Sequence, residues 1–314
     1  MKKVLITGVT AFVGSHLADK LVKEEVEVHG IKRPRSRDEF INPKVIYHEA
    51  DVIDYVGITE TIKTVQPEVI FHLAAQSFVP LSWQAPTATL NTNIIGTLNI
   101  LEGVRKFSPE TKVQVAGSSE EYGMVYPGET PIKEGNPLRP MSPYGVSKVA
   151  ADLLAQQYYM SYSIHTVITR AFNHEGPRRG ENFVTSSFAK QIALIEKGKQ
   201  EPTIKVGSLE ASRDFTDVRD MIEAYCLAVR ICSPGEPYNI CSGKSYKIQE
   251  VLDILLGYSK IWIRVEKDAS RMRVSDVPLL LGDCTKFKKL TGWTSKIPFE
   301  QTLLDTLNFW RERI

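Results

Sequence analysis

The 314-residue sequence has few cysteines, little excess of charge of either sign and no long hydrophobic run. Its four cysteines lack CxxC spacing, so we expect reduced, buried thiols and no metal site. A net charge of +2, from 39 Lys+Arg and 37 Asp+Glu, is not typical of a nucleic-acid-binding protein. No stretch approaches the roughly 18 apolar residues of a membrane span, and no signal-peptide hydrophobic region follows Met1. We therefore expect a cytoplasmic protein that binds neither nucleic acid nor membrane.

The first two thirds of the chain alternate short β-rich runs with long amphipathic segments. Such alternation predicts βα units, and near-continuously apolar strands predict a parallel sheet covered on both faces. The expected fold class is α/β, a Rossmann-type doubly wound parallel sheet with a smaller, interleaved C-terminal domain. The six predicted strands span residues 4–7, 26–32, 45–48, 69–73, 113–116 and 166–169.

The sequence pattern changes after about Phe172, where Gly and Pro residues separate shorter elements. A helical pattern at 218–231 followed by a strand-like run at 238–241 is expected to return to the first sheet. The predicted division is therefore a first domain of residues 1–172, completed by about 216–242, and a second domain formed by the two remaining segments, 173–215 and 243–314.

A glycine-rich turn follows the first predicted strand and leads into the helical segment that starts at Ser15. Strand, turn and helix in this order are the context that binds a dinucleotide pyrophosphate at a helix N-terminus. Ala11 stands where such loops often have their middle glycine, so its φ should be negative. The residues expected to bind the cofactor here are Gly8, Ala11, Phe12, Val13 and Gly14.

The end of the second strand lacks the acid that binds the ribose hydroxyls in NAD-selective proteins. Arg33 and Arg35 are found there instead, and guanidinium groups favour a 2′-phosphate. The sequence thus favours NADP, with NAD as the alternative and a solvated loop as the plain explanation of the basic run. Asp51 and Val52, after the third strand, are expected to contact the adenine unless Asp51 simply caps a helix.

A Tyr-x-x-x-Lys pair, Tyr144 and Lys148, precedes a good helical pattern at 149–162. The spacing places phenol and ammonium on one helical face, where the cation would favour phenolate and orient the nicotinamide ribose. Upstream, a predicted strand ends at Ser118 and Glu120, which delivers a hydroxyl and an acid to the carboxyl edge of the sheet. Glu120 should enter the same cleft as Ser118 if the segment stays extended; otherwise it caps a helix or pairs with an arginine.

These motifs together resemble the extended short-chain dehydrogenase/reductase (SDR) superfamily over essentially the whole chain. Within it the sequence looks closest to the GDP-mannose 4,6-dehydratases and the GDP-4-keto-6-deoxymannose reductases. The segments that carry the resemblance are 8–14, Leu73-Ala74-Ala75-Gln76-Ser77, Ser118-Ser119-Glu120-Glu121-Tyr122-Gly123, 142–148, 172–180 and Phe183-Val184-Thr185.

The resemblance implies a role for each matching position. Ser118 would hold the sugar O4, Tyr144 would be the acid/base on O4, Lys148 would support it, and Glu120 would be the dehydratase carboxylate. Further cofactor contacts are implied for Leu73, Ala74, Ala75, Ser77, His174 and Arg179. Substrate contacts are implied for Asn173 and Val184, with Arg213 and Arg273 as candidates for the diphosphate. The plain alternatives are surface ion pairs for the arginines, a backbone-bonded loop histidine for His174, and a helix cap for Gln76 and Ser77.

Two departures separate the candidate activities. The dehydratases usually carry a basic, Ser-rich insertion after the second strand and basic residues after the Phe-Val-Thr motif. This chain lacks the insertion and has Ser186-Ser187 after the motif, as in the reductases. The 174–180 segment and Glu120 instead favour the dehydratases. The first choice is NADP-dependent dehydration of GDP-mannose, and the alternative is NADPH-dependent 4-reduction. A 4-epimerase is a third option, and the intact Ser118, Tyr144 and Lys148 argue against a non-catalytic NADP-sensing protein.

The resemblance to related enzymes also implies a homodimer, with a tetramer as the alternative. The expected interface consists of helices at 86–107 and 149–162, unless these only cover the sheet.

Overall fold

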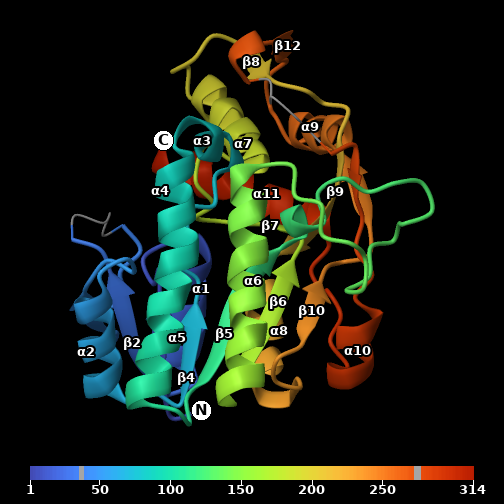
Figure 1. Ribbon diagram of the computed structural model, residues 1–314. Helices are drawn as coiled ribbons and strands as arrows, with labels where there is room; N and C mark the ends of the chain where they lie inside the picture. The colour runs from blue at the N-terminus through green and yellow to red at the C-terminus, as the bar shows by residue number, and fades with distance from the viewer. Residues whose placement is uncertain (35–38, 272–276) are drawn as a thin grey trace.

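A computed structural model describes residues 1–34, 39–271 and 277–314 (Figure 1). Seven parallel strands form its central sheet in the order β10-β6-β5-β4-β1-β2-β3. This confirms the expected Rossmann-type sheet. The strands are β1 (Lys3–Thr7), β2 (Glu27–Lys32), β3 (Ile46–Glu49), β4 (Val69–His72), β5 (Lys112–Ser118), β6 (Thr166–Ala171) and β10 (Pro237–Ile240).

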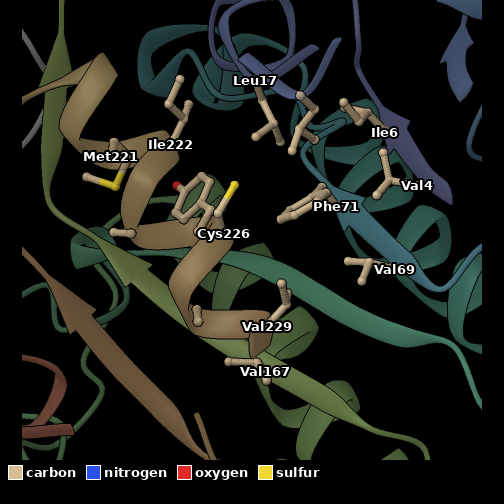
Figure 2. Close-up of a cluster of buried hydrophobic side chains, with 14 of the residues drawn as sticks. Val4, Ile6, Leu17, Val69, Phe71, Val167, Met221, Ile222, Cys226 and Val229 are labelled. Atoms are coloured by element: carbon tan, nitrogen blue, oxygen red, sulfur yellow. The ribbon is translucent and has the colours of Figure 1, made fainter. Parts of the chain in front are cut away.

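Helices cover both faces of this sheet, which makes it doubly wound. One buried cluster joins the strands to α1 and α8, and Figure 2 shows Ile222 and Cys226 on the side of α8 that faces Leu17 and Phe71. A second cluster joins the opposite face to α2, α5 and α6. Across the described residues, no helix combines the length and apolarity needed to cross a membrane. The helices around the sheet are α1 (Phe12–Lys23), α2 (Tyr55–Val65), α3 (Val79–Gln84), α4 (Pro86–Leu90), the π-helical turn η1 (Asn91–Ile95), α5 (Gly96–Phe107), α6 (Pro143–Tyr162) and α8 (Val218–Ile231).

A second group of elements lies beyond the carboxyl ends of the parallel strands (Figure 1). It has its own buried cluster, to which Phe188, Phe215 and Leu303 belong. Strand β9 pairs with β7, β11 and β13, and β8 pairs with β12. The elements are β7 (Asn173–Glu175), α7 (Val184–Glu196), β8 (Thr203–Val206), β9 (Ser212–Asp217), β11 (Ser245–Lys247), α9 (Ile248–Gly257), β12 (Arg264–Lys267), the turn η3 (Ala269–Arg271), β13 (Leu279–Leu280) and α11 (Phe299–Arg313).

The chain crosses between the two groups more than once. After β9 it forms α8 and β10, and β10 pairs in parallel with β6 at the edge of the large sheet. Helix α10 (Thr285–Thr291) also packs there, because Phe287 and Trp293 belong to the cluster of α1 and α8. The C-terminal stretch therefore contacts both groups of elements.

Candidate active site

The glycine-rich turn after β1 leaves almost no space for additional atoms. Gly8 has a φ of +68°, and a Cβ on Gly14 would lie 2.2 Å from the carbonyl oxygen of Gly8. Ala11 has a φ of −84°, so its methyl group is tolerated, as the sequence predicts. Helix α1 starts at Phe12 without a side-chain cap or an acid in its first turn. Its first N–H groups are therefore available for an anion.

A buried hydrogen-bond chain fixes the loop after β4 beside this turn. The Thr7 Oγ1 accepts the N–H groups of Leu73 and Ala74 at 3.1 and 3.0 Å, so its own hydrogen points to Nδ1 of His72, 2.9 Å away. Burial lowers the pKa of His72 to about 3, which keeps the ring neutral. Its Nε2 then carries the hydrogen and donates to Oγ1 of Thr97 at 3.1 Å. No sequence motif marks Thr7 and His72 as parts of the site.

The expected contacts to the adenosine half lie after β2 and β3. Arg33 is exposed just past the end of β2, and Arg35 lies outside the described residues. Asp51 accepts the N–H of Ile53 at 3.2 Å, while Asp54 is the N-cap of α2, so Asp51 does not cap that helix. Val52 is buried.

Helix α6 starts earlier than the helical pattern at 149–162 indicates. Ser142 is its N-cap and accepts the N–H of Gly145 at 3.0 Å, so Tyr144 and Lys148 stand one turn apart inside the helix. The Lys148 ammonium is buried and donates to the carbonyl of Ala116 at 2.7 Å. It lies 5.9 Å from the centre of the Tyr144 ring. Burial lowers the pKa of Lys148 to about 8, so it is mostly charged at neutral pH.

Burial also controls the phenol of Tyr144. It raises the pKa of Tyr144 above the usual range; the hydrogen bond with Ser118 and the charge of Arg179 lower this pKa, and Glu120 raises it. The expected phenolate is therefore not the favoured form in this structure, because desolvation outweighs the cations. A buried neutral phenol next to a serine hydroxyl is a proton donor.

The segment after β5 does not stay extended. It folds into the 3₁₀ turn η2 (Ser119–Glu121), in which the N–H of Glu120 donates to Oγ of Ser118 at 3.2 Å. Glu120 is half-buried, and its charge raises the pKa of Tyr144. The capping role falls to Glu121, whose Oε1 accepts the N–H of Ser118 at 2.6 Å. The sequence signal for this was the capping-box spacing from Ser118 to Glu121.

Arg179 and His174 lie against the glycine-rich turn. The His174 Nδ1 bonds the carbonyl of Phe172 at 3.0 Å, and its ring stacks on Phe12 with centroids 6.1 Å apart. The Arg179 guanidinium lies between Phe12 and Phe183, at 4.9 and 3.5 Å from their centroids. Among the described residues its buried Nε makes no hydrogen bond, but it lies 3.6 Å from Oε2 of Glu175, with which it forms an ion pair. A guanidinium beside the N-terminus of α1 fits the pyrophosphate of a dinucleotide.

The residues expected to contact the substrate lie in the second group of elements. Asn173 is the first residue of β7 and Val184 the first of α7, and both are partly buried. Arg213 in β9 is buried and donates through Nη1 to the carbonyls of Ser212 and Val277 at 2.9 and 2.7 Å. Arg273 lies outside the described residues.

Asn93 connects the loop after β4 to the catalytic helix. Its Oδ1 accepts the N–H of Gln76 at 2.8 Å, and its Nδ2 donates to Oγ of Ser147 at 2.8 Å. Ser147 in turn donates to the carbonyl of Tyr144 at 2.6 Å. Ser77, the neighbour of Gln76, is exposed. The sequence gives no hint of Asn93, because it is buried in the π-helical turn η1.

A family model described as GDP-mannose 4,6 dehydratase matches residues 5–306. The chain belongs to the GDP-mannose 4,6 dehydratase family. It is 30% identical over 313 residues to the GDP-6-deoxy-D-mannose reductase of Pseudomonas aeruginosa, covering 100% of this chain and 98% of the relative. It is 33% identical over 319 residues to GDP-mannose 4,6 dehydratase 1 of Arabidopsis thaliana, covering 96% and 87%.

Solved structures agree with membership of the GDP-mannose 4,6 dehydratase family and of the extended SDR superfamily. The structure of RMD from Pseudomonas aeruginosa complexed with NADPH has a TM-score of 0.87 at 29% identity, with both chains covered completely. That of the Thermus thermophilus UDP-glucose 4-epimerase complexed with NAD has a TM-score of 0.90 at 27% identity, covering 99% and 100%. The fold prediction from the sequence is confirmed.

Proposed function

We propose that this chain is an NADP-dependent GDP-mannose 4,6-dehydratase that forms GDP-4-keto-6-deoxymannose in the cytoplasm. The observation that carries the proposal is the position of Glu120, whose N–H donates to Oγ of Ser118 and whose charge raises the pKa of Tyr144. Dehydration needs a base near C5 in addition to the acid/base on O4, and Glu120 is a second group of the required kind.

NADP would bind along the carboxyl edge of the large sheet. The N-terminus of α1 and the guanidinium of Arg179, which lies against Phe12, suit its pyrophosphate, and the close approach of Gly8 and Gly14 suits its backbone contacts. Arg33, with Arg35, supports NADP over NAD, since guanidinium groups favour the 2′-phosphate. When bound, this cofactor supplies an acceptor for hydride from C4 and a donor of hydride to C6.

The residues of the chain would then divide the proton transfers. Ser118 lowers the pKa of Tyr144, so a sugar O4 bound by both hydroxyl groups can lose its proton to Tyr144. Only the phenolate can accept this proton, so Tyr144 must first ionise against the effect of burial; the Lys148 ammonium, 5.9 Å from the ring centre, would favour that ionisation. Once C4 is a ketone, the C5–H is acidic, and Glu120 removes it as water leaves C6.

The second candidate is the NADPH-dependent 4-reductase. One observation favours it: burial raises the pKa of Tyr144, and this favours the neutral phenol, the form that donates a proton to a C4 alkoxide. The near-complete mutual coverage with the reductase from Pseudomonas aeruginosa also supports it, whereas the chain spans 87% of the Arabidopsis dehydratase. This reaction needs no base at C5.

Two incubations, with products followed by mass, test the proposal. The first contains GDP-mannose and NADP+, and the second contains the 4-keto sugar nucleotide and NADPH. A dehydratase converts GDP-mannose with the loss of one water and without net reduction of cofactor. Turnover in the second incubation alone would contradict the proposal and support the reductase.

The proposal includes a homodimer built from α5 and α6, with residues 173–215 and 243–314 as the nucleotide-sugar unit. Helix α6 exposes Val146, Leu153 and Met160, at 46%, 52% and 74% of their surfaces. Three apolar side chains exposed on one helix are typical of an association surface. Light scattering measures the oligomeric state. A monomer would contradict the proposed homodimer, and a tetramer would require a further interface.

A further inference from the structure

Three ionisable side chains are packed together behind the catalytic residues. Glu121 and Asp152 have no exposed surface, and Arg170 is 3% exposed. The Arg170 Nε lies 2.7 Å from Oδ2 of Asp152 and 3.2 Å from Oε2 of Glu121. Two carboxyl groups thus share one guanidinium in a site without water access.

Glu121 is joined directly to the catalytic turn. Its Oε1 accepts the N–H of Ser118 at 2.6 Å, and the hydroxyl of the same serine contacts Tyr144. A Cβ on Gly117 would lie 2.7 Å from this oxygen, so no larger residue fits at 117 without moving the carboxyl group. The position of Glu121 therefore fixes the backbone from which the Ser118 hydroxyl projects.

The charges near Glu121 balance only as a group of four. Glu121 and Asp152 supply the carboxylates, and Arg170 and the buried Lys148 supply the cations. Glu121 raises the pKa of Lys148 against the effect of burial, while burial and Asp152 raise the pKa of Glu121. Uptake of one proton by the carboxyl pair would leave one uncompensated buried positive charge, and this favours loss of the Lys148 proton. Within the described residues, the titratable or charged groups facing Glu121 are Asp152, Lys148 and Tyr144 from α6, Arg170 from β6, and Tyr122 from its own turn.

We propose that Glu121 is a positioning residue of this active site, which anchors the Ser118 turn and provides the buried negative charge that keeps Lys148 protonated. Arg170 lies 3.2 Å from its Oε2 and is itself held by Asp152 at 2.7 Å. The inference rests on the proposed function insofar as Ser118, Tyr144 and Lys148 are its catalytic set. It adds a residue that acts through them without touching the substrate.

Two substitutions separate the two roles. Glu121→Gln keeps an oxygen that can accept the Ser118 N–H but removes the charge, and Glu121→Leu removes both. Glu196→Gln is the matched control, since Glu196 pairs with Arg311 outside the catalytic site. The readouts are NADPH affinity as a function of pH, by fluorescence titration, and kcat and KM for the sugar that the parent protein converts.

For Glu121→Gln, the pH at which NADPH affinity falls on the alkaline side should drop by about one unit, because the Lys148 ammonium loses a neighbouring anion. A midpoint equal to those of the parent and Glu196→Gln would overturn the charge role. For Glu121→Leu, kcat should fall roughly tenfold or more with KM within about threefold, since the serine is displaced. An unchanged kcat would overturn the anchoring role. If the parent converts neither sugar, the proposed function fails, yet the NADPH titration still decides the inference.

Discussion

Burial determines the acid–base state of the individual site residues more than the neighbouring charges do. It lowers the pKa of Lys148 to about 8 and that of His174 to about 4, and it raises the pKa of Tyr144. The four-residue spacing predicts that Tyr144 and Lys148 lie on one face of a helix. The direction of the Tyr144 shift could not be predicted, because spacing along a helix gives no information about desolvation.

Replacing Tyr144 by Phe should lower turnover by about 10² to 10⁴-fold, because the ring still packs while the proton-transfer group is lost. NADP affinity should stay within a few fold of the parent value. Tyr55→Phe is a suitable control, since Tyr55 is exposed at the start of α2 and its hydroxyl accepts a hydrogen bond from Lys106. Steady-state kinetics with substantial remaining activity would contradict the assigned role.

The cofactor preference can be tested at Arg33 and Arg35. Replacing both with Ala should weaken NADP binding much more than NAD binding, by roughly 1–3 kcal/mol per well-formed phosphate contact. The exposed Arg264→Ala in β12 provides the control. Calorimetric titration of the parent with both cofactors is the check, and equal affinity for NAD and NADP would refute the preference.

At the scale of the elements, the sequence predicts the buried strands well and the short ones poorly. Strand β1, expected at 4–7, spans Lys3–Thr7, and helix α8 has the expected bounds, because continuous apolar runs and a sustained helical period are strong signals. The two-residue β13 and three-residue β7 carry no such pattern. Their pairing with β9 depends on tertiary contacts.

The elements of the site also differ in how well the sequence predicts them. The glycine-rich turn and its negative φ at Ala11 follow from local sterics. The turn η2 has only the capping-box spacing from Ser118 to Glu121 as a local signal, because Ser119-Glu120-Glu121 contains no breaker; the bond between Ser118 and the buried Glu121 fixes it. The early start of α6 could have been predicted, since Ser142-Pro143 is a typical cap followed by a first-turn proline.

Gly14→Ala tests the close packing of the turn. The added methyl group would lie 2.2 Å from the Gly8 carbonyl oxygen, so the backbone must move. We expect the free energy of unfolding to fall by about 1–3 kcal/mol, as for other overpacked sites, together with a loss of NADP affinity. Gly257→Ala, with open space around its Cβ, is the control. Urea unfolding and NADP titration that match the parent would contradict this account.

At the scale of the whole molecule, the fold places the site where two groups of elements meet. The glycine-rich turn, Ser118 and Tyr144 come from the carboxyl edge of the parallel sheet, where such folds bind ligands. Arg179 and Phe183 come from the segment between β7 and α7, and Arg179 lies against Phe12 of α1. The site therefore forms only when both groups are folded together.

The stability of the whole fold should depend on pH through His72. Its pKa of about 3 in the folded protein is below the ordinary 6.5, so below pH 6.5 the unfolded chain takes up a proton that the folded one does not. Between pH 6.5 and 5 the parent should lose about 2 kcal/mol more unfolding free energy than His72→Gln, at about 1.4 kcal/mol per unit. Urea titrations at both pH values measure this, and parallel losses would contradict it.

The central claim, that Glu120 makes the chain a dehydratase, is tested most directly by running GDP-mannose and NADP+ in deuterium oxide with the parent and with Glu120→Gln. Glu129→Gln, at an ion pair with Arg139 outside the catalytic set, is the control. The parent and control should lose water and incorporate solvent deuterium at C5 or C6, while Glu120→Gln should form enzyme-bound NADPH and stall before water loss. If the parent shows neither water loss nor exchange, yet oxidises NADPH with the 4-keto sugar at a rate that Glu120→Gln leaves unchanged, the claim is contradicted and the chain is a reductase.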